Sequence, residues 1–390
     1  MKINVSPAAM LAALRKVGRV IVWNGPLPIL HDYYFEVVDD ILYVSGSNGD
    51  VMMRSTVSDA MVEHLSDRKC FAVEASILRR AFRKLDGDQV EIVVGKSQLT
   101  VKHSCGSFML PLYDTPDEFP QPDKVDGDKF YQVSFEIPQL RGWFQRLSFA
   151  MANDELRPVM NAIDFDFTKL NGLTLCASDG HKLVRIETPQ KFEGVDAEFI
   201  MQRTVVSHLL TVMPKTGMVT LWFNRDKEFE PSRILIDDGE ELLAVWFKRI
   251  VGRYPNYQSV IPIDYIFDVT INRRKLIRSI DRASLFANPS SDLGTFVLNH
   301  ADHAGKLYIS AQDFDFSQEA YEVVDAEYSY ASPFKMGFKL PSIMDCLKVI
   351  NSEKVVFRLK DASRALIMVP EVQPTGETIT ILMMPMLVND

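Results

Sequence analysis

The chain has 390 residues, of which 47% are hydrophobic and 24% are charged, as expected for a soluble globular protein of two or three domains. It begins without a signal-peptide pattern, and no apolar run reaches the roughly 18 residues that a membrane span needs. The formal net charge of −9 disfavours, taken alone, a nucleic-acid partner. The cysteines are scattered without a C-x-x-C pair, which argues against a disulfide framework or a zinc site and favours a reducing, cytoplasmic location: Cys70, Cys105, Cys176 and Cys346.

A short strand followed by an amphipathic helix recurs six times along the chain. Pro138 and Pro341 stand where the first turn of a helix accepts proline, and Asn272 is a favourable N-cap. Successive helices begin roughly 60–70 residues apart, so each repeat has room for several strands as well. The predicted helices are Met10–Arg19, Ser76–Asp86, Pro138–Leu147, Arg203–Met213, Asn272–Ala283 and Pro341–Ile350.

A longer repeat contains this shorter one. Similar strand-and-turn segments begin at Leu42, Leu173 and Leu307, which are 131 and then 134 residues apart. The first two contain Asn48-Gly49 and Asp179-Gly180, which are typical of tight hairpin turns because these residues tolerate positive φ. The chain is therefore interpreted as a triplication.

Alternating strands follow the helices, so each half-repeat is predicted to be one helix with a small antiparallel sheet. The fold class is α+β, with three repeated domains of two such halves each. The predicted domains are residues 1–126, 127–263 and 264–390. The strands that support this division are Gln89–Val94, Leu99–His103, Met218–Phe223, Ile234–Ile236, Val355–Leu359 and Ala365–Val369.

The charge is distributed unevenly between the helices and the rest of the chain. The 64 residues of the six helices contain 16 Lys and Arg but 3 Asp and Glu, a net charge of +13 that leaves −22 for the remainder. Basic residues cluster on the second and fifth helices. A solvated outer face is the alternative for any single helix, but a shared face would favour phosphate without sequence preference.

Several motifs in order resemble the bacterial β sliding clamp family, the processivity subunit of DNA polymerase III. The most specific is the run from Gly252 to Pro262, and the others are Leu27–Leu30, Arg157–Met160, Ser178–Leu183 and Met384–Met386. The resemblance covers essentially the whole chain. It implies the DNA clamp fold, closed as a head-to-tail homodimeric ring whose helices face double-stranded DNA and whose sheets form the rim.

The basic helices and the resemblance together predict which residues face DNA. Arg157 matches a DNA-facing position of the family, whereas Asn24 stands where a basic residue often touches DNA. The predicted DNA-facing residues are Arg15, Lys16, Arg79, Arg80, Arg83, Lys84, Arg157, Arg273, Arg274 and Arg278.

The resemblance also implies a dimer interface and one partner pocket. The interface would join Phe108 and Leu110 to Leu285 and Phe286, with ordinary core packing as the alternative. The pocket would take peptides from the DNA polymerase III alpha subunit, the clamp loader and other proteins with a clamp-binding motif. Methionines suit such a shared dock because they adapt to different anchors. The pocket positions are Met160, Ser178, Gly180, His181, Lys182, Leu183, Pro255, Val260, Met383, Met384, Pro385 and Met386.

Departures from the family pattern leave the peptide preference open. Ser259 replaces a residue that is commonly basic, Lys339 replaces a smaller polar residue, and the tail Leu387–Asp390 is longer and less basic. A divergent clamp paralogue or ring scaffold serving repair is the alternative reading.

A catalytic role is not indicated. The sequence has no phosphate-binding loop, zinc-protease motif or nucleophile elbow. His300-Ala301-Asp302-His303 is interpreted as a hairpin loop rather than a metal site, and Asp164 with Asp166 as one face of a strand. Neither a cofactor, a metal nor a membrane partner is expected.

Overall fold

A computed structural model of the chain describes residues 1–22, 27–64, 69–122, 125, 129–154, 156–224, 231–237, 242–248, 250 and 252–388. Asn24 and the last two residues of the tail lie outside this part of the chain. The chain divides into two compact units: unit 1 comprises residues 1–142 and 204–251, and unit 2 comprises residues 143–203 and 252–390. The boundaries of the three predicted domains remain a prediction.

All six predicted α-helices are present, which confirms the half-repeats. The Asn272 side chain caps α5 by accepting the Lys275 N–H at 3.1 Å, as predicted. The first helix begins earlier than predicted, because Ser6 is its N-cap and accepts the Ala9 N–H at 3.2 Å. The helices are α1 Pro7–Val17, α2 Ala75–Phe82, α3 Ile137–Leu147, α4 Arg203–Val212, α5 Arg273–Ser284 and α6 Leu340–Lys348.

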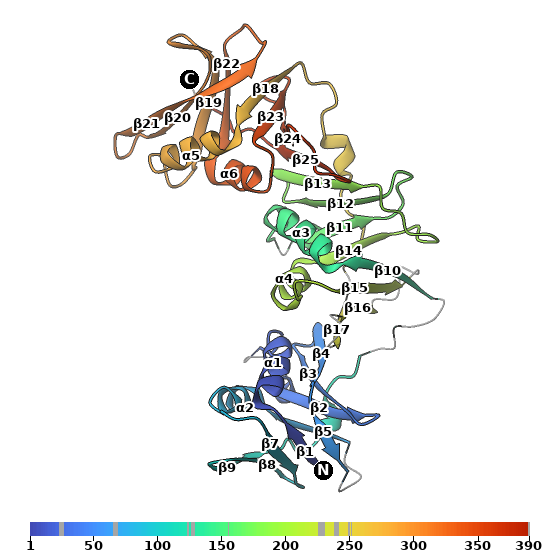
Figure 1. Cartoon of the computed structure of the whole chain (residues 1–390). Helices are drawn as coiled ribbons and strands as arrows, with labels where there is room; N and C mark the ends of the chain where they lie inside the picture. Colours follow the sequence, from blue (N-terminus) through green and yellow to red (C-terminus); the bar gives the residue numbers. More distant parts are fainter. Residues whose placement is uncertain are drawn as a thin grey trace. The chain divides into compact units, whose positions relative to one another are not determined.

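Unit 1 contains two antiparallel sheets (Figure 1). One has the strand order β5-β1-β7-β8-β9 and the other β10-β15-β16-β17-β4-β3-β2-β6. Their strands are β1 Lys2–Val5, β2 Asp32–Val38, β3 Ile41–Ser47, β4 Val51–Thr56, β5 Met61–Glu63, β6 Cys70–Glu74, β7 Val90–Val94, β8 Gln98–His103, β9 Gly106–Pro111, β10 Phe130–Glu136, β15 Met218–Asn224, β16 Pro231–Asp237 and β17 Leu242–Lys248.

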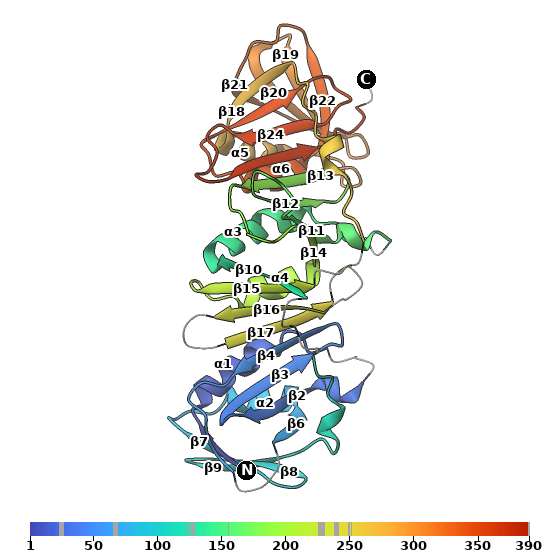
Figure 2. The ribbon, with the colours of Figure 1, turned by 90° about the vertical axis from the view of Figure 1, so that its right-hand side faces the viewer.

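Unit 2 contains one long sheet with the order β14-β11-β12-β13-β25-β24-β23-β18-β21-β20-β19-β22. Figure 2 shows β13 running beside β25, so strands from distant parts of the sequence join. The strands are β11 Ala162–Asp166, β12 Leu173–Ser178, β13 Lys182–Thr188, β14 Glu198–Gln202, β18 Phe267–Asn272, β19 Leu293–His300, β20 His303–Asp313, β21 Gln318–Tyr328, β22 Phe334–Lys339, β23 Lys354–Leu359, β24 Leu366–Pro370 and β25 Thr378–Met383.

Helices cover one face of each sheet, and this layering follows from the alternating strands. In β7 the residues Val90, Ile92 and Val94 are buried, while the two residues between them are partly exposed. Period-two burial places the apolar side chains on the face that meets the helices. On α1 the buried positions Met10, Ala13, Leu14 and Val17 recur at helical spacing and form the matching stripe.

The repeated turns have the expected backbone. Gly49 and Gly180 adopt φ of +95° and +90°, which glycine reaches at little cost. The His300–His303 segment is a hairpin connection between β19 and β20, as predicted, and the His300 ring stacks on Tyr308 with a centroid distance of 4.3 Å. Within the described residues, no group of three or more metal-binding side chains is close enough to hold an ion, and no helix is long and apolar enough to cross a bilayer.

Candidate functional site

A groove lined with arginines lies between α1 and α2 in unit 1. The two helices are in contact and lie side by side (Figure 1). The groove has a volume of about 330 Å³ and is lined by Leu11, Arg15, Arg19, Arg79, Arg80 and Arg83. None of these arginines forms an ion pair with a described carboxylate, so their charge is not neutralised locally. Such a groove attracts anions such as phosphate.

The positive charge of this groove also acts on α4 in the same unit. Burial and the charge of Arg19 lower the pKa of His208. Four of the predicted DNA-facing residues line the groove: Arg15, Arg79, Arg80 and Arg83. Lys84 is exposed just beyond the end of α2, and Lys16 is partly buried. Unit 1 therefore contains a concentrated basic surface on its helical side.

The basic residues of α5 in unit 2 divide into two kinds. Arg274 and Arg278 are exposed, lie four residues apart on one helix face, and have no described ion pair. Arg273 instead donates to the carbonyl oxygens of Ser352 at 3.0 Å and Leu347 at 3.3 Å, so its side chain is held by the chain itself. Arg282 pairs with Glu322, which raises the pKa of the guanidinium.

Other basic residues counted in the helices are structural. Arg141 on α3 donates to the Leu210 and Pro214 carbonyls at the end of α4, both at 3.1 Å. Arg146 pairs with Glu377 at 2.6 Å in unit 2. The helical charge excess therefore overstates the surface that is available to an anion.

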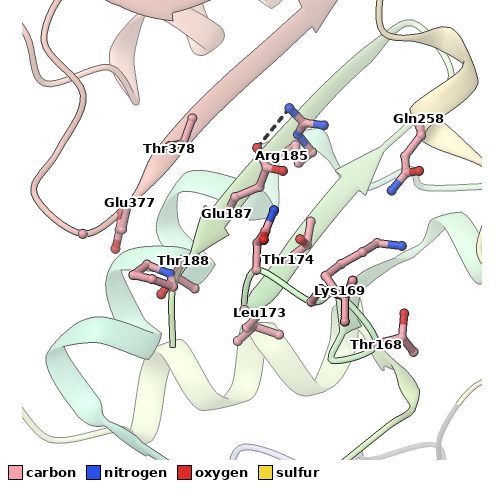
Figure 3. Close-up of a pocket in the computed structure, with 15 residues that line it drawn as sticks. Thr168, Lys169, Leu173, Thr174, Arg185, Glu187, Thr188, Gln258, Glu377 and Thr378 are labelled. Atoms are coloured by element: carbon pink, nitrogen blue, oxygen red, sulfur yellow. Dashed lines mark ion pairs between the residues drawn. The ribbon is translucent and has the colours of Figure 1, made fainter. Parts of the chain in front are cut away.

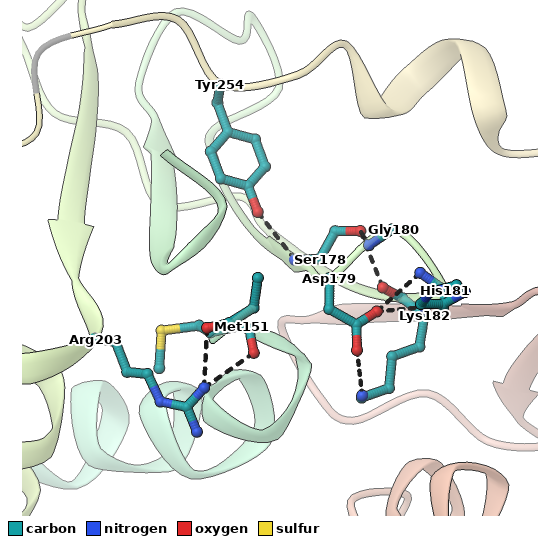
Figure 4. A network of polar contacts seen from close by, with 9 residues as sticks. Met151, Ser178, Asp179, Gly180, His181, Lys182, Arg203 and Tyr254 are labelled. Atoms are coloured by element: carbon teal, nitrogen blue, oxygen red, sulfur yellow. Dashed lines mark hydrogen bonds and ion pairs between the residues drawn. The ribbon is translucent and has the colours of Figure 1, made fainter. Parts of the chain in front are cut away.

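The predicted partner pocket centres on the turn between β12 and β13 (Figure 4). Asp179 organises this turn, since its Oδ1 accepts the N–H groups of His181 at 2.9 Å and Lys182 at 2.8 Å. The Gly180 N–H donates to Ser178 Oγ at 3.1 Å. Burial would raise the pKa of Asp179, but the Lys182 amine and the N–H groups of Lys182 and His181 outweigh it and lower this pKa.

Residues from three other segments surround the turn. The Tyr254 hydroxyl oxygen accepts the Ser178 N–H at 2.9 Å, which fastens the segment before β18 to the turn (Figure 4). The Met384 N–H donates to the His181 carbonyl at 2.8 Å, and Met383 lies opposite Lys182 in the sheet. A Cβ placed on Gly180 would lie 3.9 Å from the Met160 side chain and 3.4 Å from Arg157, so both neighbour the turn.

Most of the predicted pocket positions therefore come together in unit 2. Met384 is 41% exposed and offers apolar surface, whereas Met383 and Leu183 are buried beneath it. Pro255 is exposed beside Tyr254, and Val260 is exposed at the end of the short helix Tyr257–Val260. Met386 donates its N–H to the Gly337 carbonyl at 2.8 Å, so the tail lies along β22 after Pro385.

Arg157 lies beside this pocket. Its Nε donates to Asp154 at 2.8 Å, and about half of its side chain is exposed. The pairing leaves part of the guanidinium accessible, so the predicted DNA-facing role is compatible with its position. Two residues that depart from the family pattern also form contacts within the chain. Ser259 Oγ donates to the Asn256 carbonyl at 2.8 Å, and Lys339 Nζ lies 3.6 Å from Asp292 Oδ2.

The four predicted interface residues lie at or near strand and helix ends. Phe108 and Leu110 occupy β9, opposite Val101 and Leu99 of β8, so they share the helix-facing side of that sheet. Leu110 is already buried within its own chain, which agrees with ordinary core packing, the alternative to an interface role. Leu285 and Phe286 follow α5 and are 76% and 38% exposed.

A polar cavity on unit 2 was missed by sequence reasoning (Figure 3). It has a volume of about 740 Å³, and its charged lining residues are already paired, as Arg185 with Glu187 at 3.0 Å and Lys169 with Asp166 at 2.8 Å. The signal that could have located it is the alternation of polar residues along β12 and β13, such as Thr174, Arg185 and Glu187. Paired charges of this kind provide no activated nucleophile or base.

Strand β11 in unit 2 carries a buried acid that the sequence interpretation treated only as a strand face. Asp164 is 2% exposed, and its Oδ1 has no hydrogen-bond partner among the residues that the structure describes. Burial, with smaller contributions from Glu198 and Asp166, raises its pKa to about 8. Burial also raises the pKa of Tyr254 and Tyr257 well above the ordinary tyrosine value. This acid is therefore neutral at pH 7 and is part of the interior.

The repeated halves, with basic helices on one face of antiparallel sheets, define the DNA clamp fold. Family models for the DNA polymerase III beta subunit match the chain in its N-terminal domain at residues 1–123 and in its C-terminal domain at residues 258–387. The chain therefore belongs to the DNA polymerase III beta subunit family, the β sliding clamps, which are processivity factors of DNA replication.

Individual relatives agree along the whole chain. Proteins named "Beta sliding clamp" are 26% identical in Haemophilus influenzae, over 93% of this chain and 94% of the relative, and 23% identical in Synechocystis, over all of both. The crystal structure of the beta subunit from Pseudomonas aeruginosa is similar with a TM-score of 0.87 at 24% identity, covering all of both chains. These names do not favour the alternative of a paralogue serving repair.

Proposed function

We propose that the chain closes with a second copy into a head-to-tail ring around duplex DNA and holds polymerase and other partners at the turn Ser178–Leu183. The observation that carries this proposal is a pair of open strand edges at equivalent places in the repeats. A ring would pair both edges, which an isolated chain leaves exposed.

The repeats specify which edges those are. In unit 1 the third strand after α1, β4, pairs antiparallel with the third strand after α4, β17. In unit 2 the equivalent strands β13 and β25 pair in the same way. The two strands that remain in these positions are β9 and β21. Among the described strands β9 pairs with β8 alone. β21 pairs with β20 along one edge, and its other edge pairs with β18 through 326–328 only.

Side chains next to these edges support the same pairing. Phe108 faces the helical side of β9, and Leu285 and Phe286 follow α5, which packs on β21. On the other side of the sheets, Met109 and Tyr321 are 65% and 66% exposed. A β9–β21 contact would bury apolar groups on both sides, as lasting interfaces do.

The arginine groove supports DNA as the occupant of the ring. Its guanidinium groups carry positive charge and have no carboxylate partner among the described residues. A binding surface of this kind tracks phosphates irrespective of base sequence. Arg274 and Arg278 extend the same chemistry to α5.

The topological test compares circular and linear DNA. Chain loaded on nicked circular DNA should remain bound at high salt and should leave once the DNA is linearised, because a topological link does not depend on counterions. Equal, salt-dependent loss from both forms would contradict the ring.

A further inference from the structure

The turn after β3 repeats the hydrogen bonds of the turn after β12. The Gly49 N–H donates to Ser47 Oγ at 3.0 Å, and the Val51 N–H donates to Asn48 Oδ1 at 2.8 Å. The Ser47 hydroxyl donates to the Val51 carbonyl at 3.3 Å. These bonds join the same positions as in the turn Ser178–Lys182, where the serine hydroxyl also donates across the turn. Unit 1 thus contains a copy of the scaffold that organises the proposed partner pocket.

The strands beside this turn continue the equivalence. In both units the strand that follows the turn pairs antiparallel with the last strand of a later half-repeat. Met52 opposite Trp246 takes the place of Leu183 opposite Leu382, while Phe247 and Lys248 take the places of Met383 and Met384. The equivalent buried positions are therefore apolar in both units, whereas Lys248 takes the place of the exposed Met384.

A cavity of about 200 Å³ opens at this place, between the turn, β17 and the segment Pro120–Pro122. This volume is below the roughly 300–1,000 Å³ of small-molecule sites, so it fits one or two side chains rather than a nucleotide or a cofactor. Ser232 lines the cavity and is fully buried, and its Oγ has no hydrogen-bond partner in the described part of the chain. A buried hydroxyl without a partner costs free energy unless a ligand supplies the bond.

We propose that this cavity, defined by Ser47, Met52, Ser232 and Trp246, is a second peptide-docking groove of the chain. Its occupant is a short extended segment of a partner protein, with one apolar anchor against Met52 and Trp246. The inference rests on the proposed function, because it extends the peptide-docking role of Ser178–Leu183 to the equivalent place in the repeat.

The rim determines which segments it accepts. Asp50 and Lys248 are exposed where the other groove presents His181 and Met384. The anchor of a matching segment must therefore be flanked by charged residues that complement Asp50 and Lys248. Charge complementarity of this kind decides between partners more than it adds affinity. The two grooves should consequently select different peptides.

The test is selection of peptides from a randomised display library on the full-length chain, followed by fluorescence anisotropy of the recovered peptides. The variants are Asp50→Lys and Lys248→Glu at the new groove and Met384→Glu as the matched change at the other. All three positions are exposed, so the fold should be retained. Ser232→Ala removes the unpartnered hydroxyl without removing a bond within the chain.

Two classes of peptide are expected. One should lose about tenfold or more in affinity with Asp50→Lys or Lys248→Glu, and severalfold with Ser232→Ala, yet bind Met384→Glu normally. The other should respond to Met384→Glu alone. Recovery of the second class without the first overturns the second groove and leaves the proposed function intact. Recovery of the first alone supports the second groove and contradicts the pocket at Ser178–Leu183, and recovery of no peptide contradicts both.

Discussion

The Tyr254 hydroxyl accepts the backbone N–H of Ser178 at 2.9 Å, and this bond ties the segment that leads into β18 to the turn between β12 and β13. Tyr254 is 5% exposed, so the bond is sheltered from water. The geometry of the proposed partner pocket therefore depends on Tyr254, although the exposed apolar surface there belongs to Met384.

Replacing Tyr254 with phenylalanine should loosen the turn. The Ser178 N–H would lose its partner in a buried place, at a cost of roughly 1–3 kcal/mol. Hydrogen exchange followed by mass spectrometry should show faster exchange in the 173–188 hairpin. The control Tyr321→Phe, at a position that is 66% exposed, should leave that exchange unchanged. Unchanged exchange in Tyr254→Phe would show that the bond does not restrain the turn.

The architecture was predictable because it is encoded locally and then repeated. Hydrophobic spacing, Pro138, Pro341 and Asn272 located the helices, and Asn48-Gly49 and Asp179-Gly180 located the turns. Charge counting alone could not assign roles to individual arginines. Arg273 and Arg141 bind carbonyls contributed by segments distant in sequence, which local patterns do not reveal.

The burial of certain polar side chains could not be predicted from the sequence for the same reason. Asp164 and Asp166 are two residues apart, like the residues on one face of any strand. Both are buried because β11 is paired with strands on either side, and this pairing is not visible in the local sequence. Glu377 is another example, because it receives Trp143 Nε1–H at 2.8 Å across more than 200 residues of sequence.

The triple change of Arg79, Arg80 and Arg83 to alanine should weaken DNA association with little effect on thermal stability. Each lost phosphate contact should reduce the slope of log K against log salt by about 0.9. The comparison uses electrophoretic or anisotropy titrations at several salt concentrations. The matched control is Lys354→Ala, which removes a partly exposed lysine that pairs with Glu327. An unchanged salt slope in the triple variant would show that α2 does not face the duplex.

Changing Leu285 to lysine should convert the dimer to single chains. The side chain is 76% exposed within one chain, so the substitution should not unfold it, but it would place a charge in the proposed apolar contact. Sedimentation should show particles of one chain mass instead of two. Leu170→Lys is the control, because Leu170 is 88% exposed and lies in the connection between β11 and β12, outside β9 and β21. A dimer that survives Leu285→Lys would contradict the interface at the end of α5.

Deleting residues 384–390 should abolish partner-peptide binding while the dimer persists in sedimentation. The deletion removes the exposed Met384 side chain and the backbone bonds from Met384 to His181 and from Met386 to Gly337. Because β25 ends at Met383, the sheet itself should remain paired. If the shortened chain sediments as a monomer instead, the tail belongs to the dimer interface and not to the pocket.

Replacing Asp164 with asparagine should stabilise the chain in mildly basic solution. The pKa of Asp164 is about 8 in the folded state and near 4 when unfolded, so the folded state binds the extra proton between these values. Stability from this group is therefore full below pH 4 and is lost as the pH rises toward 8. The asparagine variant lacks this loss, and at pH 8 it should gain on the order of 5 kcal/mol relative to the parent. Urea denaturation at pH 5 and pH 8 measures the difference. Asp154→Asn, which removes an acid whose pKa is lowered mainly by Arg157, should show no such gain; an equal pH dependence in parent and Asp164→Asn would contradict the assignment.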